Sequence, residues 1–435
     1  MGCGDSKGLT AKETTINNKI AERNIAKKEE SKVGVKKLNE EDEILPENND
    51  KKDIQNKTYE SNDYKDKINL IYFSYFNVIA QLFGENFVKN NKDNIYLIIN
   101  GKRSELIHKC NLNKGNNTVT IVIKNKLTDL SHMLEYYSNT YLKDISELKY
   151  LDVSQTKNFY EMFSGLKLTD INFLRNWKVS NGIDFGRMFS NSSLKDTKAL
   201  ENWDLSNCKN FSGMFNNCLY LSDIKPLQNW NVSNGTNFQD LFSHCGEITD
   251  ISPLQNWKVP KGVNFKSMFE CCSKIKSFMP LKNWNVSNGR DFDSMFYNCY
   301  LLSDTKCFEK WDVSNVNTLS RMFCGCIKLN EIESLINWDV SNCNDFSCMF
   351  FECGSLSNLN PLKNWNVSNG VNFSCMFFGC QLLINIYDLE NWNVSKGTNF
   401  DGMFGNCYDL SDVKPLQKWN IPKEQLKLIT KGEFD

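Results

Sequence analysis

The amino-acid sequence predicts an α/β repeat solenoid of about ten coils, each 26 or 27 residues long. All ten tryptophans fall in one column from Trp177 to Trp419, with a first spacing of 26 residues and later spacings of 27. A second column of ten phenylalanines runs from Phe163 to Phe404, and methionine precedes nine of them. Self-similarity at a fixed period of this length is the signature of stacked repeats, each of which buries its apolar face against its neighbours.

Each repeat is expected to contain one short α-helix. Its apolar residues lie at positions i, i+3, i+4 and i+7, which form one helix face. In the repeat that begins at Trp230 they are Phe238, Leu241, Phe242 and Cys245. The preceding residue can accept a hydrogen bond as an N-cap in every repeat. These ten residues are Asn158, Asp184, Asn210, Asn237, Asn264, Asp291, Thr318, Asp345, Asn372 and Asn399.

The rest of each repeat is expected to form a short strand with a bend, as in leucine-rich repeats. Apolar residues there are three apart, as at Leu221, Ile224 and Leu227, and Trp230 and Val232 then alternate. Proline lies in this segment in five repeats, and because it cannot donate to a ladder, it suits a strand end. These prolines are Pro226, Pro253, Pro280, Pro361 and Pro415.

A third column contains eight cysteines, for which two interpretations compete: metal or redox chemistry, or a small buried apolar residue. Leu166 and Ser192 hold the same position in the first two repeats, which favours the buried residue. Pairs such as Cys271–Cys272 lack a second pair and a histidine at zinc-site spacing. The sequence therefore predicts no metal and no cofactor. The column is Cys218, Cys245, Cys272, Cys299, Cys326, Cys353, Cys380 and Cys407.

An Asn-Gly step recurs after the tryptophan, as at Asn234-Gly235. This dipeptide is typical of a left-handed turn. The glycine position, however, holds Thr156, Cys208 or Val316 in other repeats. We therefore expect no positive φ at this step.

A small β-rich cap is expected over residues 65–128. Strands are predicted at 77–83 and 118–123, and the segment Ile95 to Ile99 followed by Asn100-Gly101 predicts a hairpin. Open ends of a repeat array need covering, which gives this segment its role.

The leucine-rich-repeat-like solenoid is expected over 129–421, and residues 422–435 are expected to form a C-terminal cap or tail. A degenerate helix is predicted to lead into the first repeat. It would carry Leu130, Met133, Leu134 and Tyr137 on one face.

Residues 1–64 are rich in Lys, Glu, Asn and Asp and poor in aromatic residues, which predicts a disordered tether. The start Met1-Gly2-Cys3-Gly4-Asp5-Ser6 matches the N-myristoylation pattern, so Gly2 would carry myristate and Cys3 palmitate. Two acyl chains anchor a protein stably, whereas one does not. The alternative is a chance match. No apolar signal segment begins the sequence, so we expect the cytosolic face of a membrane, with the cell surface as the alternative location.

Composition and motifs disfavour other functional classes. Lys and Arg total 51 and Asp and Glu total 52, so a net charge of -1 gives no electrostatic reason to expect nucleic acid as a partner. The three histidines, His108, His132 and His244, are scattered, and no phosphate-binding loop or nucleophile motif accompanies them. We therefore expect no enzyme and no small-molecule substrate.

The segment from Trp311 to Leu329, WDVSNVNTLSRMFCGCIKL, resembles the repeat of the BspA-type leucine-rich-repeat surface proteins of mycoplasmas and several protists. The similarity covers about 130–421, although most repeats here have Asn-Gly for Asn-Val and Phe for the first Met. It implies a repeat solenoid used in adhesion or protein binding, with no catalytic residues. Composition and the acylation pattern suggest a protist source.

Three functions follow as hypotheses. The first is a membrane-tethered protein-interaction scaffold with an unidentified protein partner. The second is a cell-surface adhesin of the BspA type, and the third is a purely structural spacer.

Overall fold

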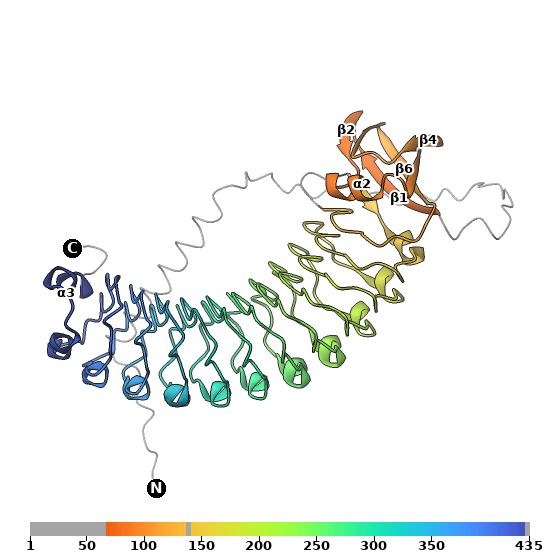
Figure 1. Ribbon diagram of the computed structural model, residues 1–435. Helices are drawn as coiled ribbons and strands as arrows, with labels where there is room; N and C mark the ends of the chain where they lie inside the picture. Colours follow the sequence, from red (N-terminus) through yellow and green to blue (C-terminus); the bar gives the residue numbers. More distant parts are fainter. Residues whose placement is uncertain (1–66, 136–140, 431–435) are drawn as a thin grey trace, which may run out of the picture. The chain divides into compact units, whose positions relative to one another are not determined.

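The computed structural model describes residues 67–135 and 141–430, all within one compact unit, Glu60–Asp435. Small antiparallel sheets come first, and repeats with short 3-10 helices follow one another after them (Figure 1). The segment predicted as a tether, 1–64, lies outside the described residues. No helix in the described ranges is long and apolar enough to cross a membrane.

Two antiparallel sheets form the N-terminal part. Five strands follow the order β4-β3-β6-β1-β7, and β2 pairs with β5. Side chains of β1 alternate between buried and partly exposed, and the Tyr72 hydroxyl donates to the Leu82 carbonyl at 2.8 Å. The elements are β1 (Lys67–Ser74), β2 (Val78–Gln81), α2 (Glu85–Asn91), β3 (Ile95–Ile99), β4 (Lys102–Glu105), β5 (Lys109–Leu112), β6 (Gly115–Ile123) and β7 (Leu142–Asp144).

Sequence predictions for these sheets are confirmed at three places. The strand predicted at 77–83 is β2, and the strand predicted at 118–123 lies in β6. The predicted hairpin joins β3 to β4. Asn100 and Gly101 have φ of 48° and 81°, as a two-residue type I′ turn requires.

Short 3-10 helices occupy the segment of each repeat for which the sequence predicts a strand, so that prediction is wrong. Apolar residues three apart, such as Ile224, Leu227 and Trp230, match the three residues per turn of a 3-10 helix. Asp223 Oδ1 accepts the Lys225 amide at 2.8 Å and turns the chain into this helix. All five prolines lie in a first turn, where a missing N–H costs little. The helices span Ser146–Tyr150, Asn172–Leu174, Lys198–Leu200, Lys225–Asn229, Ser252–Asn256, Met279–Leu281, Lys306–Phe308, Glu333–Asn337, Asn360–Leu362, Tyr387–Leu389 and Lys414–Trp419.

Consecutive tight turns replace the predicted α-helix, which is therefore also wrong. The amides of Leu241, Ser243 and Cys245 donate to carbonyls three residues back, at 3.1–3.2 Å. The alternate amides donate to the next repeat at 2.7–3.0 Å: Phe238 to Asn264, Asp240 to Lys266, Phe242 to Met268 and His244 to Glu270. A helix of two turns is unstable alone, whereas these bonds to the next repeat extend across the array. The apolar face is buried as predicted.

The column predicted as helix caps forms parallel β-bridges between successive repeats, as in Asn210, Asn237 and Asn264. In all ten repeats its side-chain oxygen accepts the amide two residues on, for example from Gln239 to Asn237 at 3.1 Å. The predicted side-chain hydrogen bond is thus confirmed. It closes a turn beside a bridge and not the end of an α-helix.

Two positions in every repeat adopt the left-handed backbone conformation. The first has φ of 51–60°, at Glu161, Arg187, Gly213, Asp240, Ser267, Ser294, Arg321, Cys348, Cys375 and Gly402. The second has φ of 54–77°, at Gly165, Asn191, Asn217, His244, Cys271, Asn298, Gly325, Glu352, Gly379 and Asn406. Seven of the second set are Gly or Asn, which tolerate this conformation best, so the sequence did carry a turn signal. Gly235 has no positive φ, as expected.

Replacing Asn217 by valine is expected to lower the free energy of unfolding by about 1–3 kcal/mol, because a β-branched side chain clashes at its φ of 57°. Asn217→Gly should stay within about 1 kcal/mol of wild type. The neighbouring Asn216→Val, which has no positive φ, is the control. Urea denaturation measures all three variants, and equal losses at 216 and 217 would contradict the backbone argument.

The fixed columns stack from one repeat to the next. The rings of Phe211 and Phe238 are 5.3 Å apart and nearly parallel. Every column tryptophan donates its Nε1–H to a carbonyl of the preceding repeat at 2.9–3.2 Å. Each column cysteine donates its thiol to the carbonyl of a column phenylalanine at 3.1–3.3 Å. Burial raises the pKa of these thiols, that of Cys218 to about 12, so they remain protonated core residues.

The helix α3 (Lys423–Ile429) follows the last repeat. The amides of Gly402 and Phe404 donate to the carbonyls of Leu428 and Ile429 at 2.9 and 2.8 Å. These two amides would otherwise require a further repeat as acceptor. The Ile429 side chain is buried. The helix α3 therefore supplies acceptors and an apolar contact to the open end of the last repeat.

At the other end, the predicted degenerate helix is wrong. The amides of Leu130 and Leu134 donate to Asn158 and Met162 at 2.8 and 2.9 Å, so this segment forms the same turns as a repeat. Leu130, Met133 and Leu134 are buried. Tyr137 lies outside the described residues.

The first two repeats are one residue short at a single turn. This turn joins the cysteine column to the next leucine. It contains Leu219 and Tyr220 in the repeat that follows Phe215, but only Lys167 or Ser193 in the first two repeats. Leu219 and Tyr220 are more than half exposed. The β-bridges at Asn158, Asp184 and Asn210 before this turn continue through the short repeats. So do the Nε1–H bonds of Trp177 and Trp203 after it.

Candidate functional site

Four residues of each repeat flank its Met-Phe or Leu-Phe pair, two on each side, and together they form what we call the variable face. In one repeat they are Gln239, Asp240, Ser243 and His244. The pair itself is buried, whereas the flanking residues differ from repeat to repeat. Their alternate amides donate to the next repeat, so equivalent residues lie side by side at a spacing of about 4.8 Å.

Charges of both signs occur along the first part of this face, in six of its first seven repeats. They are Glu161, Arg187, Asp240, Lys266, Glu270, Asp293 and Arg321. Arg187 Nη1 lies 3.5 Å from Glu161 Oε1. Ion pairs with partly exposed arginines add little stability, so these charges matter more as a surface pattern than as a source of folding energy.

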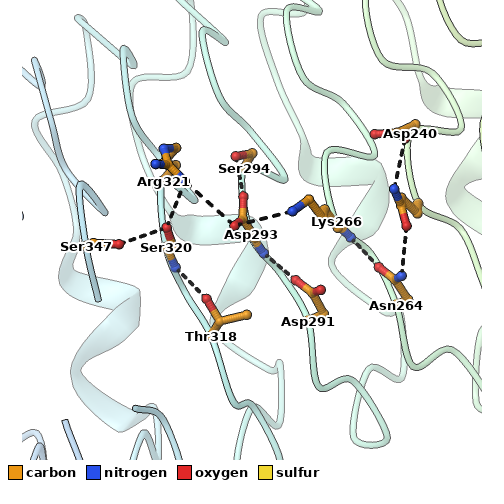
Figure 2. Close-up of polar contacts among 11 residues, drawn as sticks. Asp240, Asn264, Lys266, Asp291, Asp293, Ser294, Thr318, Ser320, Arg321 and Ser347 are labelled. Carbon is orange, nitrogen blue, oxygen red and sulfur yellow. Dashed lines mark hydrogen bonds and ion pairs between the residues drawn. The ribbon is translucent and has the colours of Figure 1, made fainter. Parts of the chain in front are cut away.

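Figure 2 shows the polar contacts in the middle of the face. Asp293 lies between two cations, 3.6 Å from Lys266 Nζ and 3.9 Å from Arg321 Nη1. The hydroxyls of Ser320 and Ser347 are 3.0 Å apart and connect the next two repeats. Successive repeats thus share polar side chains as well as backbone bonds.

The amide of Gln239 makes a similar connection on the other side of Lys266. Its Nε2 donates to Asp240 Oδ2 at 3.1 Å, and its Oε1 accepts from Asn264 Nδ2 at 3.1 Å. Burial raises the pKa of the Asp240 carboxyl. These contacts restrain the side chains of the face before any partner arrives.

The later part of the variable face is less charged. Cys348 and Cys375 occupy, one and two repeats later, the left-handed position that Arg321 holds. Phe351 and Phe378 stack with ring centroids 4.9 Å apart. The face therefore changes along the chain from mixed charge to thiol and aromatic groups.

His132 lies where the N-terminal sheets meet the repeats. Its Nδ1 contacts Glu135 and lies 3.3 Å from Glu161 Oε2, and its carbonyl accepts the Gly84 amide at 3.1 Å. Hydrogen bonding to Glu161 is the main reason that the pKa of His132 is raised to about 9. The same bond lowers the pKa of Glu161. His132 is therefore a cation at neutral pH.

Replacing His132 by glutamine is expected to remove stability that depends on pH. The folded pKa of His132, about 9, exceeds the unfolded value, so its contribution is complete below about pH 6.5 and disappears as pH rises through 9. Allowing for partial solvent screening, the loss is about 2 kcal/mol at pH 6. Urea denaturation of both proteins from pH 6 to 10 measures it. Parallel stability curves for the two proteins would contradict the assignment.

His244, Glu270 and Cys271 come together on the variable face, although no local sequence motif links them. Their ligand atoms lie within 4.8 Å of one another. Neighbouring ligands in zinc motifs are ordinarily two to five residues apart in the sequence. His244 and Cys271 are one whole repeat apart. The repeat period itself was the signal, because it predicts that residues 27 apart are neighbours.

The predicted lipidation residues Gly2 and Cys3 lie outside the described residues, so both remain predictions. His108 and His132 do not join His244. His108 lies 3.4 Å from Glu85 in the N-terminal part. The three histidines thus belong to three separate environments.

These repeats and their shared columns define a repeat protein. Five overlapping segments, 109–219, 187–307, 220–331, 276–385 and 333–428, match the family described as "Mycoplasma protein of unknown function, DUF285". Together they cover most of the chain, which therefore belongs to this family. Comparisons with curated proteins and with solved structures give no match.

Proposed function

We propose that this chain is a non-catalytic, membrane-tethered scaffold that binds a protein partner through the variable face of a leucine-rich-repeat-like solenoid. The observation that supports it most is the series of charged residues of both signs from Glu161 to Arg321. Complementary charges on a partner would provide specificity and orientation. Side chains that are already restrained also reduce the cost of association.

The solenoid interpretation rests on the bonds between repeats. Backbone amides donate from each repeat to the next, from Leu130 at one end to Gly379 at the other. An array in which each repeat contacts its neighbours presents an extended surface, which is what such proteins use for binding.

Partner binding is tested by changing the face to the residues of neighbouring repeats. Lys266→Ser and Arg321→Ser, made together, remove two cations and match Ser320 and Ser294 at the equivalent positions. The control pair, Lys282→Ser and Lys363→Ser, removes the same charge beside the 3-10 helices. Crosslinking in native cells should identify a protein that is retained by the control and lost with the face variant. Equal recovery by both variants would refute the face assignment.

The membrane tether is proposed from Gly2 and Cys3, with two acyl chains on the cytosolic face. A native N-terminus fused to a fluorescent reporter should be at a membrane, and Gly2→Ala should release it. Cys3→Ser should leave weaker, reversible binding, since a single myristoyl chain binds marginally. Identical distributions of all three proteins would refute the tether.

A BspA-type adhesin is the second candidate, and the family match and repeat resemblance favour it. It predicts that protease treatment of intact cells cleaves the chain. The scaffold predicts cleavage only after lysis. A chain that resists cleavage in intact cells and crosslinks to no protein would instead be a structural spacer.

A further inference from the structure

His244, Glu270 and Cys271 occupy adjacent repeats in fixed register. The His244 amide donates to the Glu270 carbonyl at 2.7 Å, and the Cys271 amide donates to the Tyr297 carbonyl at 2.8 Å. These bonds belong to the array of turns, so the three residues are positioned by the main chain. Their side-chain ligand atoms lie within 4.8 Å of one another.

The three side chains differ from those at equivalent positions. The position of His244 and Cys271 is Gly or Asn in seven of the ten repeats, in keeping with its left-handed backbone. Histidine and cysteine thus replace the favoured residues in two successive repeats. Glu270 stands where three other repeats have serine, at Ser164, Ser190 and Ser243.

A thiolate, an imidazole and a carboxylate are all ligands that Zn²⁺ accepts in proteins. Three protein ligands leave one tetrahedral position open, and the exposure of His244 gives an ion access from solvent. The Ser243 hydroxyl lies 2.8 Å from His244 Nδ1 and 3.5 Å from Glu270 Oε2. It therefore restrains two of the three candidate ligands, as outer-shell groups do in metal sites.

We propose that His244, Glu270 and Cys271 bind a zinc-type divalent transition-metal ion, with one open coordination position, on the variable face. Binding replaces the thiol proton of Cys271, which passes to solvent, with the bond from sulfur to the metal. This departs from the expectation of no metal that the sequence alone supports. It stands independently of the scaffold function, because it requires no protein partner.

The test uses the full-length reduced protein, stripped of metal. Isothermal titration with Zn²⁺ should show one ion per chain, and Co²⁺ should give thiolate-to-metal charge-transfer absorption. His244→Asn and Cys271→Asn place in these positions the residue that four other repeats use, so both should fold. Each should weaken Zn²⁺ binding by more than about tenfold, since even outer-shell changes have that effect.

Cys348→Ser removes a thiol from the same face outside the cluster and should leave Zn²⁺ binding unchanged. Zn²⁺ should raise the melting temperature of wild type and Cys348→Ser, but not that of Cys271→Asn. The proposal fails if wild type gives no Co²⁺-thiolate absorption, or if His244→Asn and Cys271→Asn bind Zn²⁺ as wild type does. It also fails if only Cys348→Ser loses binding, since the metal would then lie elsewhere on the face.

Discussion

Replacing Trp284 by alanine is expected to lower the free energy of unfolding by about 3–5 kcal/mol. The side chain is 2 % exposed, and its ring stacks on Trp257 with centroids 6.3 Å apart. Its Nε1–H donates to the Leu254 carbonyl at 3.1 Å, so the substitution leaves both a cavity and a buried acceptor without that donor. Trp284 lies in a central repeat, so the lost contacts cannot be confined to local unfolding of one end of the array.

Urea denaturation followed by far-UV circular dichroism measures this loss. Tyr220→Ala is the control, because Tyr220 is an aromatic side chain of the repeats that is 58 % exposed. It should change stability by less than about 0.5 kcal/mol. A loss at Trp284 no larger than that at Tyr220 would show that the tryptophan column does not hold the repeats together.

Replacing Ile429 by aspartate is expected to detach α3 from the last repeat. The Ile429 side chain is fully buried, and a carboxylate there would have no partner, so the helix leaves the surface rather than bury the charge. The amides of Gly402 and Phe404 then lose their acceptors on α3. Their hydrogen exchange should accelerate by more than about tenfold, which corresponds to about 1.4 kcal/mol of local stability.

Leu428→Asp introduces the same charge in the same helix at a side chain that is 37 % exposed. Its backbone carbonyl still accepts the Gly402 amide, so protection at Gly402 and Phe404 should remain close to wild type. Exchange measured by NMR or mass spectrometry distinguishes the two variants. Equal acceleration in both would mean that helix propensity, and not burial of Ile429, holds α3 in place.

The sequence predicted the repeat and its buried columns, but it predicted the wrong local structure between them. Phe238, Leu241, Phe242 and Cys245 have helical spacing and are all buried, yet their segment forms turns. Periodicity shows which side chains face the core, and a turn segment with left-handed residues at Asp240 and His244 gives the same pattern as a helix. The choice depends on bonds to the next repeat, which a pattern within one repeat cannot reveal.

The sequence predicted strands in the segments that form 3-10 helices, although the spacing of the apolar residues already indicated these helices. A spacing of three at Ile224, Leu227 and Trp230 is the 3-10 period, and Pro226 in the first turn agrees with it. The strand interpretation came from analogy with leucine-rich repeats. The spacing of three and the position of Pro226 indicate a 3-10 helix, whereas the analogy indicated a strand.

The candidate site could be predicted only in part. Variable positions between fixed ones indicated which residues form the face, but not that oppositely charged residues such as Lys266 and Asp293 contact each other between repeats. His244 and Cys271 are unrelated in any local motif, and only the stacking of repeats makes them neighbours. Residues that lie one period apart in a repeat sequence can therefore form one site.

The single residue missing from the first two repeats identifies where such a chain can change its length. The turn between the cysteine column and the next leucine lies between the Asn/Asp bridge column and the tryptophan column, whose bonds between repeats continue through both short repeats. A residue gained between Asn237 and Phe242 would displace several donors from their acceptors at once. During evolution, such a gene can duplicate whole repeats or alter this one turn in a single mutational step, whereas other insertions need a compensating second change.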